Sequence, residues 1–228
     1  MSQIIYVINA SSRTDTGITQ DLARSLAWAE GTKLAQIRCV TLEDGPNGIS
    51  NARDSDNAAP AVLRFVERES AKSESAAFVV ACFSDPGVYA ARELTSKPVI
   101  GIGEAGYLAA FAIADLVGTI GVSAGRGEKT MRMVRQMGLR ERIAGHRGLG
   151  LDYGQLQDPA IVLDALIQAG KALRDEDGAQ AILFAGAGLA RYVAPLQDAT
   201  GLPVVDPTQA AVAIALGQVM QAAYVPAR

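Results

Sequence analysis

The stretch that decides the fold is residues 77–103, AFVVACFSDPGVYAARELTSKPVIGIG. It begins with an apolar run, turns at Asp85-Pro86-Gly87, and ends in a second apolar run at Pro98–Ile102. Short apolar runs rich in β-branched residues predict buried strands. Pro and Gly at a turn of this kind suit the first turn of a helix, here expected over Gly87–Leu94. The stretch therefore predicts a strand–helix–strand unit, which is typical of parallel sheets.

The same alternation of short apolar runs and longer amphipathic or Ala-rich stretches continues along the chain. Strands are expected over Gln3–Asn9, Leu34–Thr41, Ala77–Phe83, Pro98–Ile102, Gly118–Val122, Gly148–Leu151, Ala179–Ala185 and Pro203–Val205. Further helices are expected over Thr16–Ala29, Ala58–Lys72, Glu104–Asp115, Glu128–Met137, Pro159–Asp175, Leu189–Ala199 and Gln209–Ala223. This order predicts an α/β fold with mostly parallel sheets that are covered by helices on both faces. Ligands of such sheets bind beyond the carboxyl ends of the strands.

Composition is typical of a soluble globular protein, with 49% apolar and 20% charged residues among 228. The net charge of −3 provides no basic field for nucleic acid, and no apolar run approaches the roughly 20 residues of a membrane span. The N-terminus lacks the features of a secretory signal peptide, and two cysteines do not make a disulfide framework. We therefore expect a cytoplasmic protein with reduced thiols that binds neither nucleic acid nor membrane. A homo-oligomer is expected from the small, Ala-rich chain.

A polar segment, Glu43–Pro60, interrupts the alternation and carries the turn-forming residues Gly45-Pro46-Asn47-Gly48. A loop of this length inside a compact domain is often a functional flap. An ordinary surface loop is the alternative interpretation.

Two parts of the sequence resemble each other and predict an internal repeat. Apolar runs lead into Cys82 and into Gly186, Pro98 follows Cys82 by 16 residues, and Pro203 follows Gly186 by 17. An Ala-rich helix is expected after each of these prolines. The pattern favours two similar α/β halves, in which the loops at Cys82 and Gly186 occupy equivalent positions.

Cys82 is the candidate catalytic residue, because it ends a predicted strand and opens a turn toward a helix. Free backbone N–H groups and the positive end of a helix favour a thiolate, which accepts protons and acts as a nucleophile. A buried structural cysteine is the alternative. Cys39 lies inside a strand pattern and is interpreted as structural.

The run Gly101-Ile102-Gly103-Glu104-Ala105-Gly106 matches the G-x-G-x-x-G dinucleotide fingerprint. The acidic residue that should follow at the end of the next strand is replaced by Arg126, which leaves NADP as an alternative. The run lies in mid-chain, so a tight strand-to-helix turn is the preferred interpretation, and no cofactor is expected. His146, the only histidine, has no neighbours at metal-ligand spacing, so no metal is expected and a surface position is predicted.

Small polar residues follow two other predicted strands. Asn9, Ser11 and Ser12 could cap the next helix or bind a substrate carboxylate, and the same pair of interpretations applies to Ser123. Arg92 and Glu93 are expected to make only solvated surface contacts.

These residues together resemble the hydantoin racemases of the aspartate/glutamate/hydantoin racemase superfamily. The run from Cys82 to Gly87 followed by the run from Pro98 to Ala105 is similar to their first-cysteine segment. The run from Leu183 to Ala190 followed by the run from Leu202 to Pro207 is similar to their second-cysteine segment. Gly45-Pro46 and the Asn9 loop resemble their early loops, so the likeness runs along essentially the whole chain.

The resemblance implies two similar lobes with the active site in the cleft between them, and no cofactor. We expect one lobe to comprise residues 1–94 and 207–228, and the other residues 95–206. In such enzymes one cysteine removes the proton α to a carboxylate or carbonyl group, and a second cysteine on the opposite lobe returns one to the other face. Backbone amides and small hydroxyls hold the developing negative charge.

The sequence departs from this pattern at the second cysteine, whose position is occupied by Gly186. The family's first loop often has a proline where this chain has Ala10. A racemase or epimerase that uses Cys82 is the leading hypothesis, acting on an amino-acid derivative or hydantoin-like compound. The alternatives are a single-cysteine decarboxylase or cis-trans isomerase of the same fold, or a non-catalytic small-molecule binding protein. The expected substrate contacts are Asn9, Ser11, Ser12, Phe83, Ser84, Ser123, Ala187 and Gly188.

Overall fold

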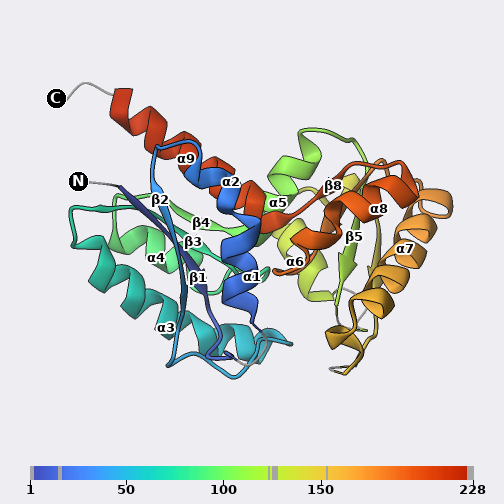
Figure 1. The fold of residues 1–228 in the computed structure, drawn as a ribbon, viewed down its shortest axis with the longest axis horizontal. Helices are drawn as coiled ribbons and strands as arrows, with labels where there is room; N and C mark the ends of the chain where they lie inside the picture. Colours follow the sequence, from blue (N-terminus) through green and yellow to red (C-terminus); the bar gives the residue numbers. More distant parts are fainter. Residues whose placement is uncertain (1–2, 15–16, 123, 125–127, 153, 225–228) are drawn as a thin grey trace. The chain divides into compact units, whose positions relative to one another are not determined.

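The structure of the protein is a computed structural model, which describes residues 3–14, 17–122, 124, 128–152 and 154–224. The chain divides into two compact units (Figure 1). Unit 1 comprises Met1–Ala105 and Thr208–Arg228, and unit 2 comprises Gly106–Pro207. The sequence placed the first boundary after residue 94. The structure places it later, because the strand at Val99–Gly101 pairs within the sheet of unit 1.

Unit 1 contains a four-stranded sheet of order β2-β1-β3-β4, in which every pair of strands is parallel. The strands are β1 (Ile4–Asn9), β2 (Gln36–Thr41), β3 (Ser75–Val80) and β4 (Val99–Gly101). All residues of β1 and β3 are buried, as expected for the central strands of a parallel sheet. Parallel pairing brings the carboxyl ends of β1 and β3 to the same edge.

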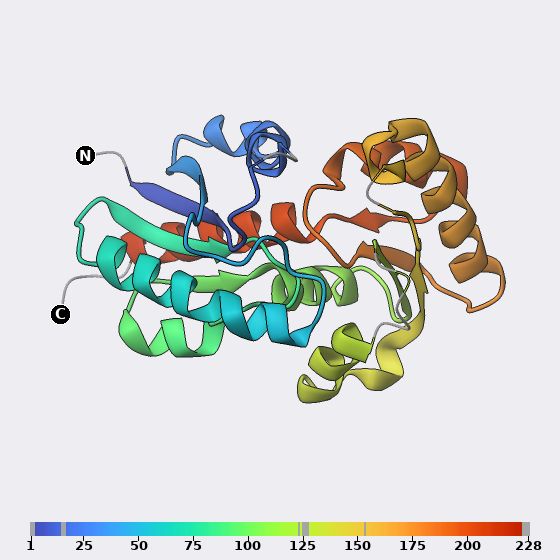
Figure 2. The ribbon, with the colours of Figure 1, turned by 90° about the horizontal axis from the view of Figure 1, so that it is seen from below.

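Helices cover both faces of this sheet (Figure 2). They are α1 (Ile18–Ser25), α2 (Ala27–Glu30), α3 (Ala52–Ser70), α4 (Val88–Leu94), the first part of α5 (Ile102–Phe111), and α9 (Pro207–Tyr224) from Thr208 onward. α1 and α2 lie on one face, and α3 and α4 on the other. α9 is joined to the end of α1 by a hydrogen bond from Gln209 Nε2 to the Ser25 carbonyl oxygen, 3.3 Å.

Unit 2 contains a second parallel sheet, of order β6-β5-β7-β8. Its strands are β5 (Val117–Gly121), β6 (Ile143–Gly148), β7 (Ala181–Phe184) and β8 (Val204–Val205). Its other helices are α6 (Glu128–Gln136), α7 (Pro159–Asp175) and α8 (Val193–Thr200), with short 3-10 turns at Arg140–Arg142, Gln155–Gln157 and Ala190–Tyr192. α7 and α8 cover one face and α6 the other (Figure 2). The expected α/β fold with two mostly parallel sheets is confirmed.

The main cores lie on corresponding faces of the two sheets. In unit 1 the apolar stripe of α3 packs against β1 and β3, and in unit 2 that of α7 packs against β5 and β7. The α3 stripe consists of Ala58, Ala61, Val62, Phe65 and Val66, and the α7 stripe of Val162, Leu166 and Leu173. Since each stripe follows helical periodicity, both cores were predictable as faces of amphipathic helices.

Backbone hydrogen bonds establish which residues of the two units are equivalent. Ala81 N donates to Ile8 O (2.8 Å), and Ala185 N donates to Ile120 O (2.7 Å). The proline before the last strand of each sheet also accepts an equivalent hydrogen bond. Phe78 N donates to Pro98 O, and Ile182 N donates to Pro203 O, both at 2.9 Å. The two units therefore share one topology and register, as the internal repeat predicted.

The structure corrects the predicted start of α3. α3 begins at Ala52 rather than at Ala58, because Asn51 and Asp54 form a capping box at its N-terminus. Pro60 lies within the helix, although proline usually interrupts one. The polar segment thought to extend to Pro60 is therefore half helix, and the loop ends at Asn51.

Strand β6 is also displaced from its prediction, since it spans Ile143–Gly148 instead of Gly148–Leu151. Its sequence, IAGHRG, has a single β-branched residue, so its apolar signal is weak. The prediction that His146 is a surface residue is wrong, because it lies half-buried on this strand. Within the part of the chain that the structure describes, no helix is long and apolar enough to cross a membrane.

Candidate active site

The turn after β3 carries Cys82, and its backbone is tightly constrained. Asp85 N donates to Cys82 O at 2.9 Å, and Val88 N donates to Asp85 O at 3.3 Å. Asp85 and Gly87 both have positive φ, 49° and 73°, a conformation that glycine adopts freely and Asp tolerates. The helix that the sequence predicted from Gly87 begins at Val88, with Gly87 as its N-cap.

Asp85 ties this turn to the next helix. Its carboxylate accepts hydrogen bonds from Gly103 N and Glu104 N, both 2.8 Å, and so caps the N-terminus of α5. A Cβ atom at Gly101 would overlap the Asp85 carboxyl group, which is why this position needs glycine. Burial raises the pKa of Asp85 to about 7, against the lowering effect of the two N–H donors.

The capping by Asp85 gives the G-x-G-x-x-G run a structural role. A dinucleotide would place its pyrophosphate on the free N–H groups at the start of the helix. Two of these groups, on Gly103 and Glu104, already donate to Asp85. Arg92, expected only at the solvated surface, also supports this turn by donating to Val99 O (2.9 Å) and pairing with Glu104 (2.8 Å).

The sulfur of Cys82 lies in a small network of hydroxyl groups. Cys82 is half-buried and packs against the core of unit 1. Its Sγ atom lies 3.3 Å from Ser84 Oγ. Ser84 Oγ in turn accepts a hydrogen bond of 2.9 Å from Ser55 Oγ in the first turns of α3. Phe83, between Cys82 and Ser84, is buried (6% exposed).

The loop after β1 lies at the same edge of the sheet. Asn9 Oδ1 accepts hydrogen bonds from Ser11 N (3.2 Å) and Ser11 Oγ (3.0 Å), and Asn9 Nδ2 donates to Thr19 Oγ1 (3.4 Å). Asn9 is buried, so its side chain organises the loop. Ser12 N donates to Pro46 O (3.0 Å), which ties this loop to the one that begins at Gly45.

In unit 2 the equivalent turn follows β7. Cys82 and Gly186 each stand two residues after the last residue of their strand, Val80 and Phe184. A Cβ at Gly186 would have Val122 Cγ2 as its nearest neighbour, 3.9 Å away. Gly188 has a φ of 84°, a conformation that favours glycine at this position. Ala187, between the two glycines, is half-buried. Ser123 lies outside the residues that the structure describes.

Two other titratable candidates, His146 and Cys39, lie within strands. His146 Nδ1 shares a hydrogen bond of 2.8 Å with Thr119 Oγ1, and burial and the nearby Arg147 lower the pKa of the imidazole. Cys39 lies in β2, and burial raises the pKa of its thiol to about 11, which makes it a poor nucleophile at neutral pH. No group of three or more His, Cys, Asp or Glu side chains suited to a metal ion occurs among the described residues.

Sequence reasoning missed two residues of this site, Ser55 and Asp85. Ser55 was assigned to the polar loop, although the Asn51–Asp54 capping box was a signal that the helix begins before it. Asp85 was read as part of a turn, because its contact with Gly103 and Glu104 spans 18 and 19 residues.

Comparison with known proteins gives the class to which this fold and site belong. Residues 5–215 match the family model described as Asp/Glu/Hydantoin racemase. The match covers nearly the whole chain, and the protein therefore belongs to the Asp/Glu/hydantoin racemase family, as its sequence motifs indicated.

Individual relatives extend this result. The hydantoin racemase of Paenarthrobacter aurescens is 31% identical over 212 residues, which are 92% of this chain and 89% of the relative. The solved allantoin racemase from Klebsiella pneumoniae has a TM-score of 0.85 at 27% identity, over 97% of this chain and 89% of that one. Unliganded arylmalonate decarboxylase shares the fold alone, with a TM-score of 0.64 at 16% identity over 100% and 95% of the two chains. The prediction of an isomerase of racemase type is supported by these relatives.

Proposed function

We propose that the protein is a racemase or epimerase that needs no cofactor and transfers the α-proton of a hydantoin-like compound or a related amino-acid derivative through Cys82. The observation that carries the proposal is the environment of Cys82, whose sulfur follows a buried strand and lies beside the Ser84 hydroxyl. The names of the relatives, hydantoin racemase and allantoin racemase, support the substrate class.

The proposed chemistry begins with the thiolate of Cys82. It takes the proton from the α-carbon, and the electron pair of that C–H bond moves onto the adjacent carbonyl to form an enolate. The thiol then returns a proton to the carbon. An S–H proton exchanges with water, so the returned proton comes from solvent. The small hydroxyls and amides proposed to hold the enolate oxygen, as preorganised dipoles, are those of Ser11, Ser12, Phe83, Ser84, Ser123, Ala187 and Gly188, with Asn9 holding the first loop.

Gly186 gives this enzyme one thiol in place of the two that the family resemblance implies. A glycine cannot carry a proton, so inversion requires that the second face be served by water or by another group. A second candidate function follows from the same observation. In a decarboxylase, loss of CO₂ supplies the carbanion and a single thiol at Cys82 protonates it on one side.

The test is solvent deuterium incorporation followed by ¹H NMR and optical rotation. The protein is incubated in deuterated buffer with hydantoins, allantoin, aspartate, glutamate and arylmalonates. We expect the α-proton signal of a hydantoin or of allantoin to disappear, with loss of optical rotation, and no exchange by Cys82→Ala. Loss of CO₂ from an arylmalonate without exchange of the others would favour the decarboxylase. Undiminished exchange by Cys82→Ala would overturn both candidates.

A further inference from the structure

We infer that Ser55 is a positioning residue which orients the Ser84 hydroxyl so that it donates its hydrogen to the sulfur of Cys82. The inference rests on the proposed function, in which Cys82 acts as a thiolate. It assigns a role to a residue on α3, a helix that contributes nothing else to the proposed chemistry.

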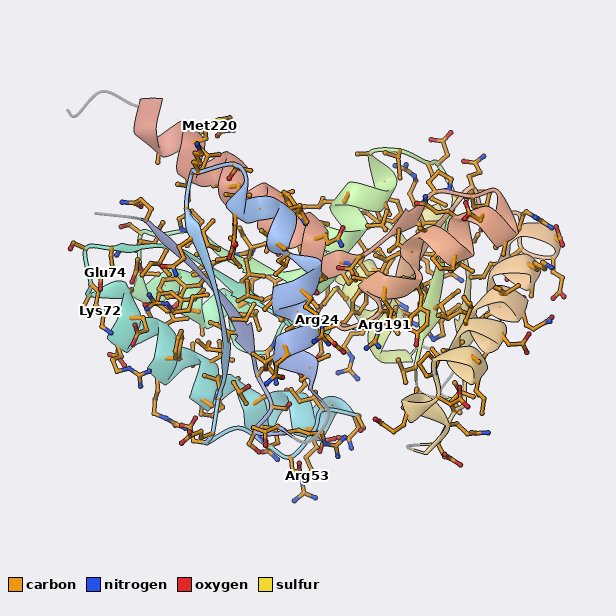
Figure 3. The ribbon with its side chains drawn as sticks, viewed as in Figure 1. Arg24, Arg53, Lys72, Glu74, Arg191 and Met220 are labelled. Atoms are coloured by element: carbon orange, nitrogen blue, oxygen red, sulfur yellow. The ribbon has the colours of Figure 1, made fainter. Side chains whose placement is uncertain are left out.

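Ser55 is held at a buried position in the first turns of α3. The capping box of Asn51 and Asp54 fixes the start of α3, and Ser55 follows as a buried residue (8% exposed). Arg53, in the same turn, is exposed and points away from the unit (Figure 3). A hydroxyl at the buried position needs a partner there, and that partner is Ser84 Oγ at 2.9 Å.

A serine hydroxyl has one hydrogen to donate and two lone pairs that accept. When Ser55 donates to Ser84, one lone pair of Ser84 is used and its own hydrogen is free to point elsewhere. The Cys82 sulfur, 3.3 Å away, is then the acceptor of that hydrogen.

The sulfur of Cys82 can be a thiolate or a thiol, and the two states use the Ser84 hydrogen differently. A thiolate only accepts, so Ser55, Ser84 and Cys82 form an aligned chain in which every hydrogen is used. A thiol that donates to Ser84 would fill the second lone pair and leave the Ser84 hydrogen without this acceptor. Hydrogen bonds to the charged form favour that form, and aligned hydroxyls polarise one another. The chain also begins at Ser55 in the first turns of α3, whose N-terminal end carries partial positive charge.

The test is the rate at which iodoacetamide alkylates Cys82 as a function of pH, in the full-length protein with Cys39→Ala so that one thiol remains. We expect Ser55→Ala to lower the rate at pH 7 by about tenfold, because Ser84 would no longer be held as a donor to the charged sulfur, with the pH–rate profile moved to higher pH. Ser55→Thr, which keeps the hydroxyl, should restore most of the rate. Ser70→Ala, which removes a hydroxyl at the other end of α3, should leave it unchanged.

A double-mutant cycle tests whether Ser55 acts on Cys82 through Ser84, a relay of hydrogen bonds, or whether the two serines act on the thiol independently. Because Ser55 acts through Ser84, adding Ser55→Ala to Ser84→Ala should produce no further loss. An unchanged profile in Ser55→Ala, or additive losses, would overturn the inference. Alkylation does not depend on turnover, so an unchanged profile together with loss of deuterium exchange in Cys82→Ala would refute the relay and leave the proposed function standing.

Discussion

The turns after β3 and β7 occupy equivalent positions in the two units, and they differ in what they hold in place. In unit 1 Asp85 binds the start of α5, Ser84 lies beside Cys82, and Gly101 leaves room for Asp85. In unit 2 the equivalent of Cys82 is Gly186, whose surroundings would admit a side chain. The comparison shows that the turn in unit 1 holds a thiol and a capping carboxylate, whereas the turn in unit 2 has glycine at the position of the thiol and its positive φ at Gly188.

The strongest test of this comparison is to introduce a thiol in unit 2 at the position equivalent to Cys82. Gly186→Cys should raise the rate of racemisation by about 100-fold, since a positioned proton donor contributes on the order of 10²–10⁴ in rate. The Cβ atom meets only an ordinary contact with Val122 and φ at Gly186 is not positive, so the variant should fold normally. Gly186→Ser, with a less acidic group, is the matched control. Equal racemisation by Gly186→Cys and wild type would show that the second face is already served.

Two glycines of the two units should differ in their tolerance of a methyl group. Gly101→Ala should lower the free energy of unfolding by about 2 kcal/mol, because Asp85 must leave its place and a helix cap is lost. Gly186→Ala should remain within about 1 kcal/mol of wild type. Urea denaturation followed by circular dichroism measures both. Equal losses would mean that the turn in unit 1 is no more constrained than the one in unit 2.

Unit 1 should also show a pH dependence of stability that comes from Asp85. The pKa of Asp85 is raised from 3.8 to about 7 in the folded protein, so the folded state binds more protons than the unfolded state between these values. Stability from this group is therefore fully present below pH 3.8 and is lost as pH rises to about 7. The free energy of unfolding of wild type relative to Asp85→Asn should fall from pH 4 to pH 7. A difference that is constant, or that rises with pH, would contradict the assigned protonation.

Helices and strands with a strong apolar pattern were predicted from the sequence, whereas elements whose position depends on polar contacts were missed or displaced. β1, β3 and α7 are apolar or amphipathic and were recognised, whereas β6 lacks such a pattern and was displaced. The first turns of α3 were not predicted, because Pro60 suggested that no helix extended across it, whereas α3 contains this proline.

The residues of the candidate site were likewise predictable only in part. Cys82 and its turn could be found, because the residues that define them are consecutive. Ser55 and the contacts of Asp85 could not, because the hydrogen bonds join segments 29 and 18–19 residues apart. The equivalence of Cys82 and Gly186, by contrast, was visible in the repeat itself.

The central claim is that Cys82 is the residue that transfers the proton, and a matched pair of cysteine variants tests it most directly. Deuterium exchange at the α-carbon of a hydantoin is measured for wild type, Cys82→Ala and Cys39→Ala. Cys39→Ala should exchange at nearly the wild-type rate, and Cys82→Ala should lose at least about 10³-fold, as expected when a proton-transfer group is removed. Folded Cys82→Ala that exchanges as fast as Cys39→Ala would contradict the claim.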